Sequence, residues 1–108
     1  MDSDGTFRVI LRMQTIPGKG AEFEQAWLDG AVLIMAEPAN LEQSLSKSTA
    51  EDNVYYIVSD WVDEPAFRAY ERSERHVEHR SRLHPYRASG SMLTMSVLHE
   101  MTGARVRA

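Results

Sequence analysis

The stretch from Val54 to Pro85 constrains the fold most, because a strand pattern runs directly into a capped helix pattern. Val54 opens a run of β-branched and aromatic residues, and the strand that this run predicts closes on Trp61. Asp63 is suited to cap a helix with a proline in its first turn, where the missing N–H costs nothing. Ser73 is a second capping candidate, so we expect the helix over 63–84 to be broken near that residue.

The rest of the chain supplies further strand patterns. Residues 6–15 alternate, which puts Phe7, Val9, Leu11 and Met13 on one face. Residues 40–48 predict a half-exposed strand that pairs as a hairpin with 54–61, and residues 91–101 predict the last strand.

Another helix is predicted to begin at Ala21, after the turn over 17–20, and to end before Pro38. Its buried stripe has helical spacing and consists of Phe23, Ala26, Trp27, Gly30, Ala31 and Ile34. A second apolar line, formed by Leu28, Val32 and Met35, exceeds what one buried face requires. This line indicates either tight packing under a loop or a contact between subunits.

The order strand–helix–strand, repeated once, predicts an α+β fold of the ferredoxin-like split βαβ type. Its four-stranded antiparallel sheet carries the helices on one face. The domain spans 6–101, between a disordered tail over 1–5 and a second tail over 102–108. Because the strands are apolar on both sides, the other face also needs cover, and we expect a second copy of the chain to provide it in a homodimer.

Composition excludes several classes of function. With 108 residues and no cysteine, the chain is one domain without thiol nucleophiles, disulfides or cysteine metal sites. The net charge of −4 argues against a nucleic-acid partner. The N-terminus lacks the pattern of a secretory signal, and no apolar run is long enough to cross a membrane, so we expect a cytoplasmic protein without a membrane partner.

The residues suited to chemistry gather in the stretch 54–85. Trp61 and Tyr55 share strand parity, and Tyr70 and His76 come from the helical segment that follows. Alternatively, Trp61 is only a core anchor and His76 only a partly exposed helix histidine.

Other polar residues near these positions carry weaker predictions. His79 lies one turn after His76 and, like His84, is better explained as structural. Asn40 and Gln43 are suited to contact polar groups of a substrate, or belong to an ordinary edge strand. No metal site is predicted, since no third ligand has recognisable spacing from the histidines.

Between Phe7 and Met101 the chain resembles the antibiotic biosynthesis monooxygenase domain of the dimeric α+β barrel superfamily. The resemblance rests on Ile16-Pro17-Gly18-Lys19-Gly20 with Glu22-Phe23, and on the stretch Tyr55–Trp61 running into Asp63–Phe67. Trp61 matches the tryptophan that commonly ends that strand, and His76 matches a common downstream histidine. The position nine after the tryptophan, often histidine in the family, is Tyr70 here.

Details of the helical stretch resemble members that act in aromatic polyketide pathways, namely Asp60-Trp61, His76-Val77-Glu78-His79-Arg80 and His84-Pro85-Tyr86-Arg87. The resemblance implies an oxygenase that oxidises a polycyclic phenol or anthrone with O2, without metal and without cofactor, or with reduced flavin. Such chemistry needs a base with a pKa near neutral, for which His76 is the candidate, together with Trp61 at the catalytic site. Substrate binding is expected from Tyr55, Tyr70, His79, Asn40 and Gln43.

The alternative function is a non-catalytic dimeric domain that binds a ligand or assembles a complex in the same pathway. An open, aromatic-lined cavity reached by a histidine favours the oxygenase. A cavity filled by Trp27, Trp61 and methionines favours the alternative.

Overall fold

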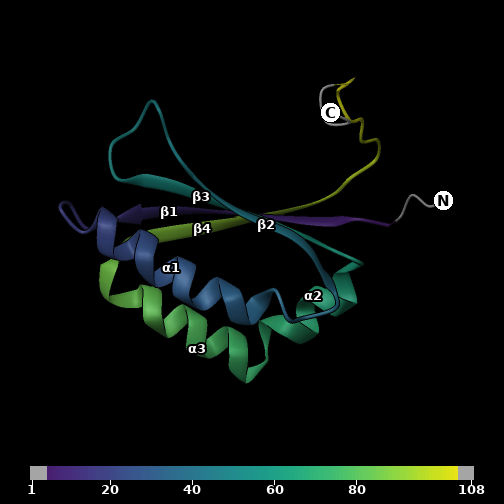
Figure 1. Ribbon diagram of the computed structural model, residues 1–108, viewed down its shortest axis with the longest axis horizontal. Coiled ribbons are helices and arrows are strands. Elements are labelled where there is room, and N and C mark those ends of the chain that lie inside the picture. Colours follow the sequence, from purple (N-terminus) through teal and green to yellow (C-terminus); the bar gives the residue numbers. More distant parts are fainter. Residues whose placement is uncertain (1–4, 105–108) are drawn as a thin grey trace.

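The computed structural model describes residues 5–104, and Figure 1 shows a curved sheet with its helices gathered on one side. The predicted tails over 1–5 and 102–108 lie largely outside the described residues. Along the chain the elements are β1 (Phe7–Thr15), α1 (Gly20–Ile34), β2 (Asn40–Lys47), β3 (Val54–Trp61), α2 (Glu64–Glu71), α3 (Glu74–Leu83), the one-turn 3₁₀ helix η1 (His84–Tyr86) and β4 (Arg87–Ser96).

The sheet has the strand order β2-β3-β1-β4, and every neighbouring pair is antiparallel. The register sets Phe7 beside Trp61 and Leu11 beside Ile57, so their side chains share the face that the helices cover. This arrangement confirms the predicted ferredoxin-like split βαβ fold.

The break between α2 and α3 has the predicted cause. The Asp63 carboxylate accepts a hydrogen bond from the backbone N–H of Ala66 at 2.8 Å and caps α2. The Ser73 hydroxyl accepts one from the N–H of His76 at 3.3 Å and caps α3. Two short helices therefore replace one long helix, and the change of direction brings the start of α3 over the sheet.

The core lies between the sheet and the helices and is built from two clusters. The first joins Phe23, Trp27 and Leu83 of the helices to the β3 residues Tyr55 and Ile57. The second is formed by Phe7, Val9, Ile34, Trp61, Phe67 and Tyr70. The buried stripe predicted for α1 is confirmed, since its Phe, Trp, Gly and Ile positions are all buried.

The last strand differs from the prediction at both ends, because it runs from Arg87 to Ser96 and not from Ser91 to Met101. The reason is long-range pairing. The N–H of Ile16 donates to the carbonyl of Tyr86 at 2.9 Å, so the chain already lies beside the end of β1 where it leaves η1. Pairing with Thr15 then begins at Arg87.

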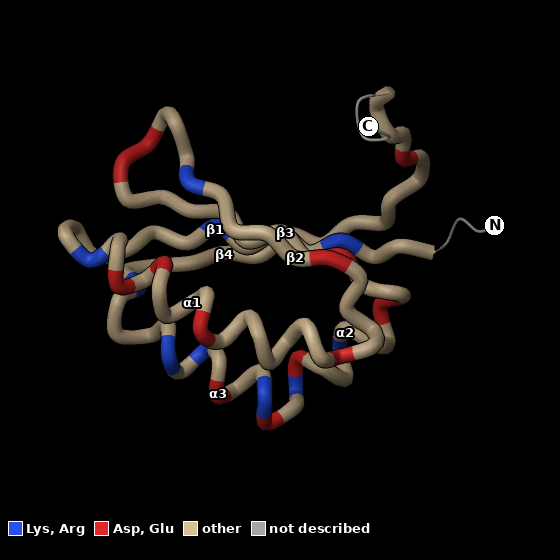
Figure 2. Tube along the Cα trace, in the orientation of Figure 1, with Lys and Arg blue, Asp and Glu red and all other residues tan. Residues whose placement is uncertain are grey.

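Apolar side chains remain exposed in two places. On the sheet face that the helices leave open, Leu93 is 64% exposed beside Ile10. On the outer side of α1, Val32 is 69% exposed in line with Leu28 and Met35. The outer side of α3 instead carries interleaved basic and acidic residues, as Figure 2 shows, with Arg82 and Glu78 paired at 2.8 Å. Within residues 5–104 none of the helices is long and apolar enough to cross a membrane.

Candidate active site

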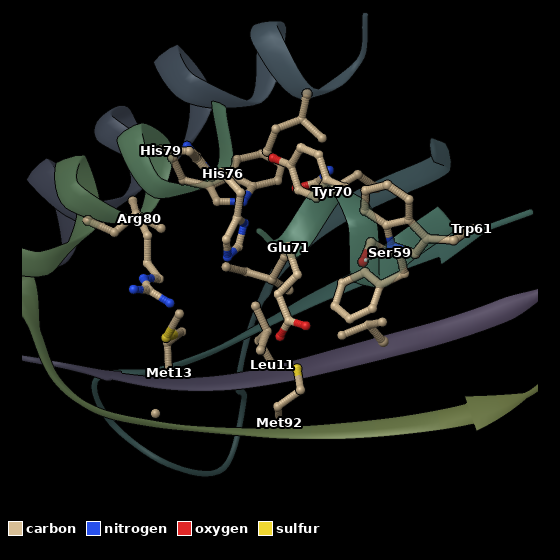
Figure 3. A pocket seen from close by; sticks show the side chains of 18 of the residues that line it. Leu11, Met13, Ser59, Trp61, Tyr70, Glu71, His76, His79, Arg80 and Met92 are labelled. Carbon is tan, nitrogen blue, oxygen red and sulfur yellow. Dashed lines mark hydrogen bonds between the residues drawn. The ribbon is translucent and has the colours of Figure 1, made fainter. Parts of the chain in front are cut away.

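A cavity of about 260 Å³ lies between the helix-covered face of the sheet and α1, α2 and α3. Its floor is apolar and comes from Val9, Leu11, Ile57 and Met92. Figure 3 shows Trp61 toward one end, Arg80 toward the other, and His76 between them.

The Trp61 end of the cavity is aromatic. The indole N–H of Trp61 donates to the Ser59 hydroxyl at 2.9 Å, which fixes the orientation of the ring. Trp61 packs against Tyr70 with ring centroids 4.9 Å apart and against Phe67 at 5.4 Å. The result is a rigid aromatic wall of the kind that binds flat ring systems.

His76 is half-buried and points toward the sheet, between Arg80 and Glu71 (Figure 3). Its ring meets Tyr70 edge-on, with centroids 5.2 Å apart. Burial and then the positive charge of Arg80 lower the pKa of His76, while Glu71 opposes them. The neutral imidazole therefore predominates near pH 7, which is the form that accepts a proton.

His79 has a different environment, although it also contacts the cavity. It is 6% exposed, and the Nδ1 edge of its ring occupies the space that a side chain at Gly30 would need. Burial, followed by the charges of His76 and Arg82, lowers the pKa of His79 to about 4. His79 is thus a neutral packing residue that locks α3 against α1.

Three buried polar atoms of cavity-lining residues have no hydrogen-bond partner among the described residues, and one of them, His79 Nδ1, lies against Gly30. The other two are the Tyr70 hydroxyl and the Trp27 indole N–H. Burial, with a contribution from Glu37, raises the pKa of Tyr70 to about 12, so its hydroxyl keeps its proton. Buried polar groups are normally satisfied, and polar atoms of a bound molecule are one way to satisfy these.

The structure brings together most, but not all, of the residues that the sequence singles out. Trp61, Tyr70, His76, His79 and Gln43 all contact the cavity.

Tyr55 and Asn40 do not contact it. The Tyr55 ring packs on Phe23 with centroids 5.0 Å apart, and its hydroxyl donates to Glu24 at 2.5 Å. Asn40 begins β2 and donates to the backbone carbonyl of Asp60 at 3.4 Å.

Several cavity residues were not site candidates in the sequence analysis, notably Glu71, and Arg80 and Arg87, which occur there only within segments that resemble the family. Arg80 is the one with a usable signal, since it follows His76 by four residues on the same helix and so shares its face. Nothing local marks Arg87, because a change of element separates it from α3. Over the described part of the chain, no three His, Asp or Glu residues are grouped closely enough to hold a metal ion.

Known proteins resemble the chain both in sequence and in structure. The family model described as "Antibiotic biosynthesis monooxygenase" matches residues 6–82. Protein SchA of Streptomyces halstedii is 30% identical over 101 residues, which cover 94% of this chain but only 27% of SchA. The chain thus spans about a quarter of the length of that curated relative.

Two solved structures illustrate the shared fold. SnoaB from Streptomyces nogalater, described as a cofactor-independent oxygenase, superposes with a TM-score of 0.80 at 19% identity, over 92% of this chain and 99% of SnoaB. A candidate antibiotic biosynthesis monooxygenase from Caulobacter crescentus gives a TM-score of 0.81 at 23% identity, over 90% and 93% of the two chains. Since the family model covers about 70% of the chain, including β1 to β3, the break between α2 and α3 and the residues from Trp61 to His79, the chain belongs to the antibiotic biosynthesis monooxygenase family.

Proposed function

We propose that the chain is a small oxygenase that oxidises a polycyclic phenol or anthrone of aromatic polyketide biosynthesis with O2. The observation that carries this proposal is the position of His76, which lies in an open cavity beside an aromatic wall. The cavity volume of about 260 Å³ falls just below the range of roughly 300–1,000 Å³ typical of small-molecule sites. A compact, flat ring system suits a space of that size.

The proposed reaction begins with transfer of a proton from the substrate to the neutral imidazole of His76. The resulting anion gives one electron to O2, and the substrate radical and superoxide combine to form a carbon–oxygen bond. The peroxide takes up the proton from His76, and loss of water then breaks the O–O bond and leaves a carbonyl on the substrate. One oxygen atom ends in the product and the other in water, and the substrate supplies all the electrons.

Each cavity residue has a role in this proposal. Trp61 and Phe67 hold the rings by stacking, and the Tyr70 hydroxyl donates to an oxygen of the substrate as negative charge develops there. Gln43 and His79 contribute to the binding surface. We assign no substrate contact to Tyr55 or Asn40. Phe23 covers Tyr55, and Asn40 lies outside the cavity.

The proposal includes no metal and no flavin. Deprotonated polyphenols reduce O2 themselves, so the protein needs to supply only a base, donors and orientation. SnoaB, which has the same fold, is described as cofactor-independent, and this supports the same assignment for the chain.

The alternative, a domain that binds or assembles without catalysis, would suit a filled cavity. Trp27 contributes to the cavity wall and Met13 and Met92 to its floor, yet about 260 Å³ stays open beside His76. This open space favours the oxygenase.

We also propose that two copies of the chain pair through the open faces of their sheets. Leu93 and Ile10 lie beside each other there, and Met95 is also exposed. A second sheet would remove this apolar surface from water.

Incubation of the purified protein with 1,8-dihydroxyanthrone under O2 tests the function. We expect formation of the corresponding quinone faster than in buffer, with equal consumption of O2 and no requirement for added metal or reduced flavin. Incorporation of one labelled oxygen atom from ¹⁸O2 distinguishes the oxygenase from a peroxide-releasing oxidase. A rate no greater than that in buffer, with and without reduced flavin, would contradict the proposal.

A further inference from the structure

The end of the cavity that is remote from Trp61 is basic. Arg80 from α3 and Arg87 from the start of β4 contact both the main cavity and a more open hollow next to it. Ser81 and His84 complete the lining of that hollow. The two arginines therefore lie where the cavity and the hollow adjoin. Figure 3 shows Arg80 at the end of the cavity opposite Trp61.

Neither arginine forms an ion pair within residues 5–104, although acidic residues are nearby. Glu78 is paired instead with Arg82, with 2.8 Å between Nη2 and Oε2, and Glu71 is paired with Arg68, with 3.2 Å between Nη1 and Oε1. Glu71 is the acidic side chain that lines the cavity, so its charge is already offset. Although the chain has a net charge of −4, this end of the cavity thus carries the positive charges of Arg80 and Arg87 with no carboxylate paired to either.

Gly90 helps to keep Arg87 over the cavity. A Cβ at Gly90 would lie 3.2 Å from the Nη1 atom of Arg87 and 3.0 Å from the sulfur of Met13. The backbone of Gly90 is not in the left-handed region, so no turn requires a glycine at this position. The missing side chain instead leaves room for the Arg87 guanidinium, which lies over Gly90 of the same strand.

We propose that the substrate of this chain bears a carboxylate, which Arg80 and Arg87 bind while the rings lie between His76 and Trp61. The inference rests on the proposed function and narrows its substrate to a polycyclic aromatic acid. A planar guanidinium matches a carboxylate with two parallel hydrogen bonds, and a second cation completes the neutralisation. The hydroxyl of Ser81 and the ring of His84 extend the polar surface on the outer side.

This arrangement also couples binding to the base. The charge of Arg80 is the second cause that lowers the pKa of His76. A carboxylate on Arg80 would offset that charge and leave His76 a stronger base when an acidic substrate is bound than when the cavity is empty.

Calorimetric titration with two matched quinones tests the inference without turnover. Rhein is a dihydroxyanthraquinone with a carboxylate, and aloe-emodin has a neutral hydroxymethyl group in its place. We expect the wild type to bind rhein about 10- to 100-fold more tightly, because a charge-assisted hydrogen bond has roughly that effect on affinity. The preference should weaken as salt is added.

Variants of Arg80 and Arg87 test whether these residues cause the preference for rhein over aloe-emodin. The double variant Arg80→Gln/Arg87→Gln should lose the preference for rhein and keep its affinity for aloe-emodin, which also shows that its cavity is intact. Arg72→Gln is the matched control, since Arg72 is an exposed arginine between α2 and α3 that does not line the cavity. If the double variant does not fold, the single variants should each lose part of the preference, and Arg→Lys at either position should retain some.

The outcomes separate this inference from the proposed function. Equal affinities for the two quinones in the wild type would overturn the carboxylate site and leave the oxygenase proposal standing. A preference for rhein that survives in the double variant would likewise overturn it. If neither quinone binds, the proposed function fails and the inference fails with it.

Discussion

Two histidines one helical turn apart illustrate how strongly local surroundings decide a residue's role. Burial lowers the pKa of both His76 and His79, so both are neutral near pH 7. The His76 ring faces open space beside Tyr70, whereas the Nδ1 edge of His79 is pressed against Gly30. There is therefore room for a substrate at the ring of His76, whereas the Nδ1 edge of His79 has none.

Replacement of His76 tests the assignment of the base. His76→Ala should lower kcat by roughly 10²–10⁴-fold, the usual contribution of a positioned base, and leave the fold intact. In the wild type the rate should fall as pH drops below the pKa of His76, because the protonated ring no longer accepts a proton. The groups that face the ring are Glu71, Arg80, His79 and Tyr70. Burial and the charge of Arg80 lower the pKa of His76 by more than the charge of Glu71 raises it.

That dependence should disappear in His76→Ala, and higher pH should partly restore its rate because the phenol then ionises without help. His99→Ala, at an exposed site beyond β4, is the control and should behave as the wild type. Full activity of His76→Ala would remove the base assignment and make His79 the next candidate.

His79 should make stability depend on pH. Its folded-state pKa of about 4 lies below the ordinary value of 6.5, so the unfolded chain binds the proton more readily between these values. The contribution of His79 to stability is therefore complete above pH 6.5 and is lost as pH falls toward 4. Urea unfolding at pH 7.5 and pH 5 should show a larger loss for the wild type than for His79→Gln. An equal loss in both proteins would show that folding does not lower the pKa of His79.

Among the elements, α1 provides a packing contribution that can be tested directly. Trp27 is buried between the sheet and α3, and Trp27→Ala should destabilise the fold by roughly 3–5 kcal/mol. The adjacent Leu28 is 55% exposed on the same helix, so Leu28→Ala should change the free energy of unfolding by less than about 0.5 kcal/mol. Denaturant unfolding measures both. Similar values for the two variants would mean that α1 is rotated from the orientation described.

Elements with local signals could be predicted from the sequence closely, and those set by pairing could not. The bounds of β3 and the caps Asp63 and Ser73 match the prediction, since β-branched residues and capping side chains act over a few residues. The start of β4 was missed because Arg87-Ala88-Ser89-Gly90 has weak strand propensity. Pairing with β1 imposes the strand there.

The cavity was predictable to a similar extent. Strand parity correctly assigns Trp61 and Tyr55 to the helix-covered face. The break near Ser73, which was also predicted, turns the chain so that His76 lies near Tyr70. Parity does not give the position along the sheet, and so it could not show that Phe23 covers Tyr55 at one end while Trp61 borders the cavity at the other. Arg87 reaches the cavity only through tertiary structure.

For the whole molecule, the exposed apolar residues leave two faces through which copies of the chain could associate. One is the open face of the sheet around Leu93, and the other is the outer side of α1 around Val32. The sheet offers the flatter and broader surface, with Ile10, Leu93 and Met95 on adjacent strands, whereas α1 offers a single line. We therefore expect the sheet to be the dimer interface.

Sedimentation of matched variants decides between the two faces. At micromolar concentration the wild type should sediment as a species of about 25 kDa, twice the chain mass of 12.3 kDa. Leu93→Arg should shift the protein to the monomer, because a second sheet would bury the new charge without a partner. Val32→Arg introduces the same charge at a residue of similar exposure, 69% against 64%, and should leave the dimer unchanged. A monomeric wild type would remove the proposed dimer altogether, and dissociation by Val32→Arg alone would transfer the interface to α1.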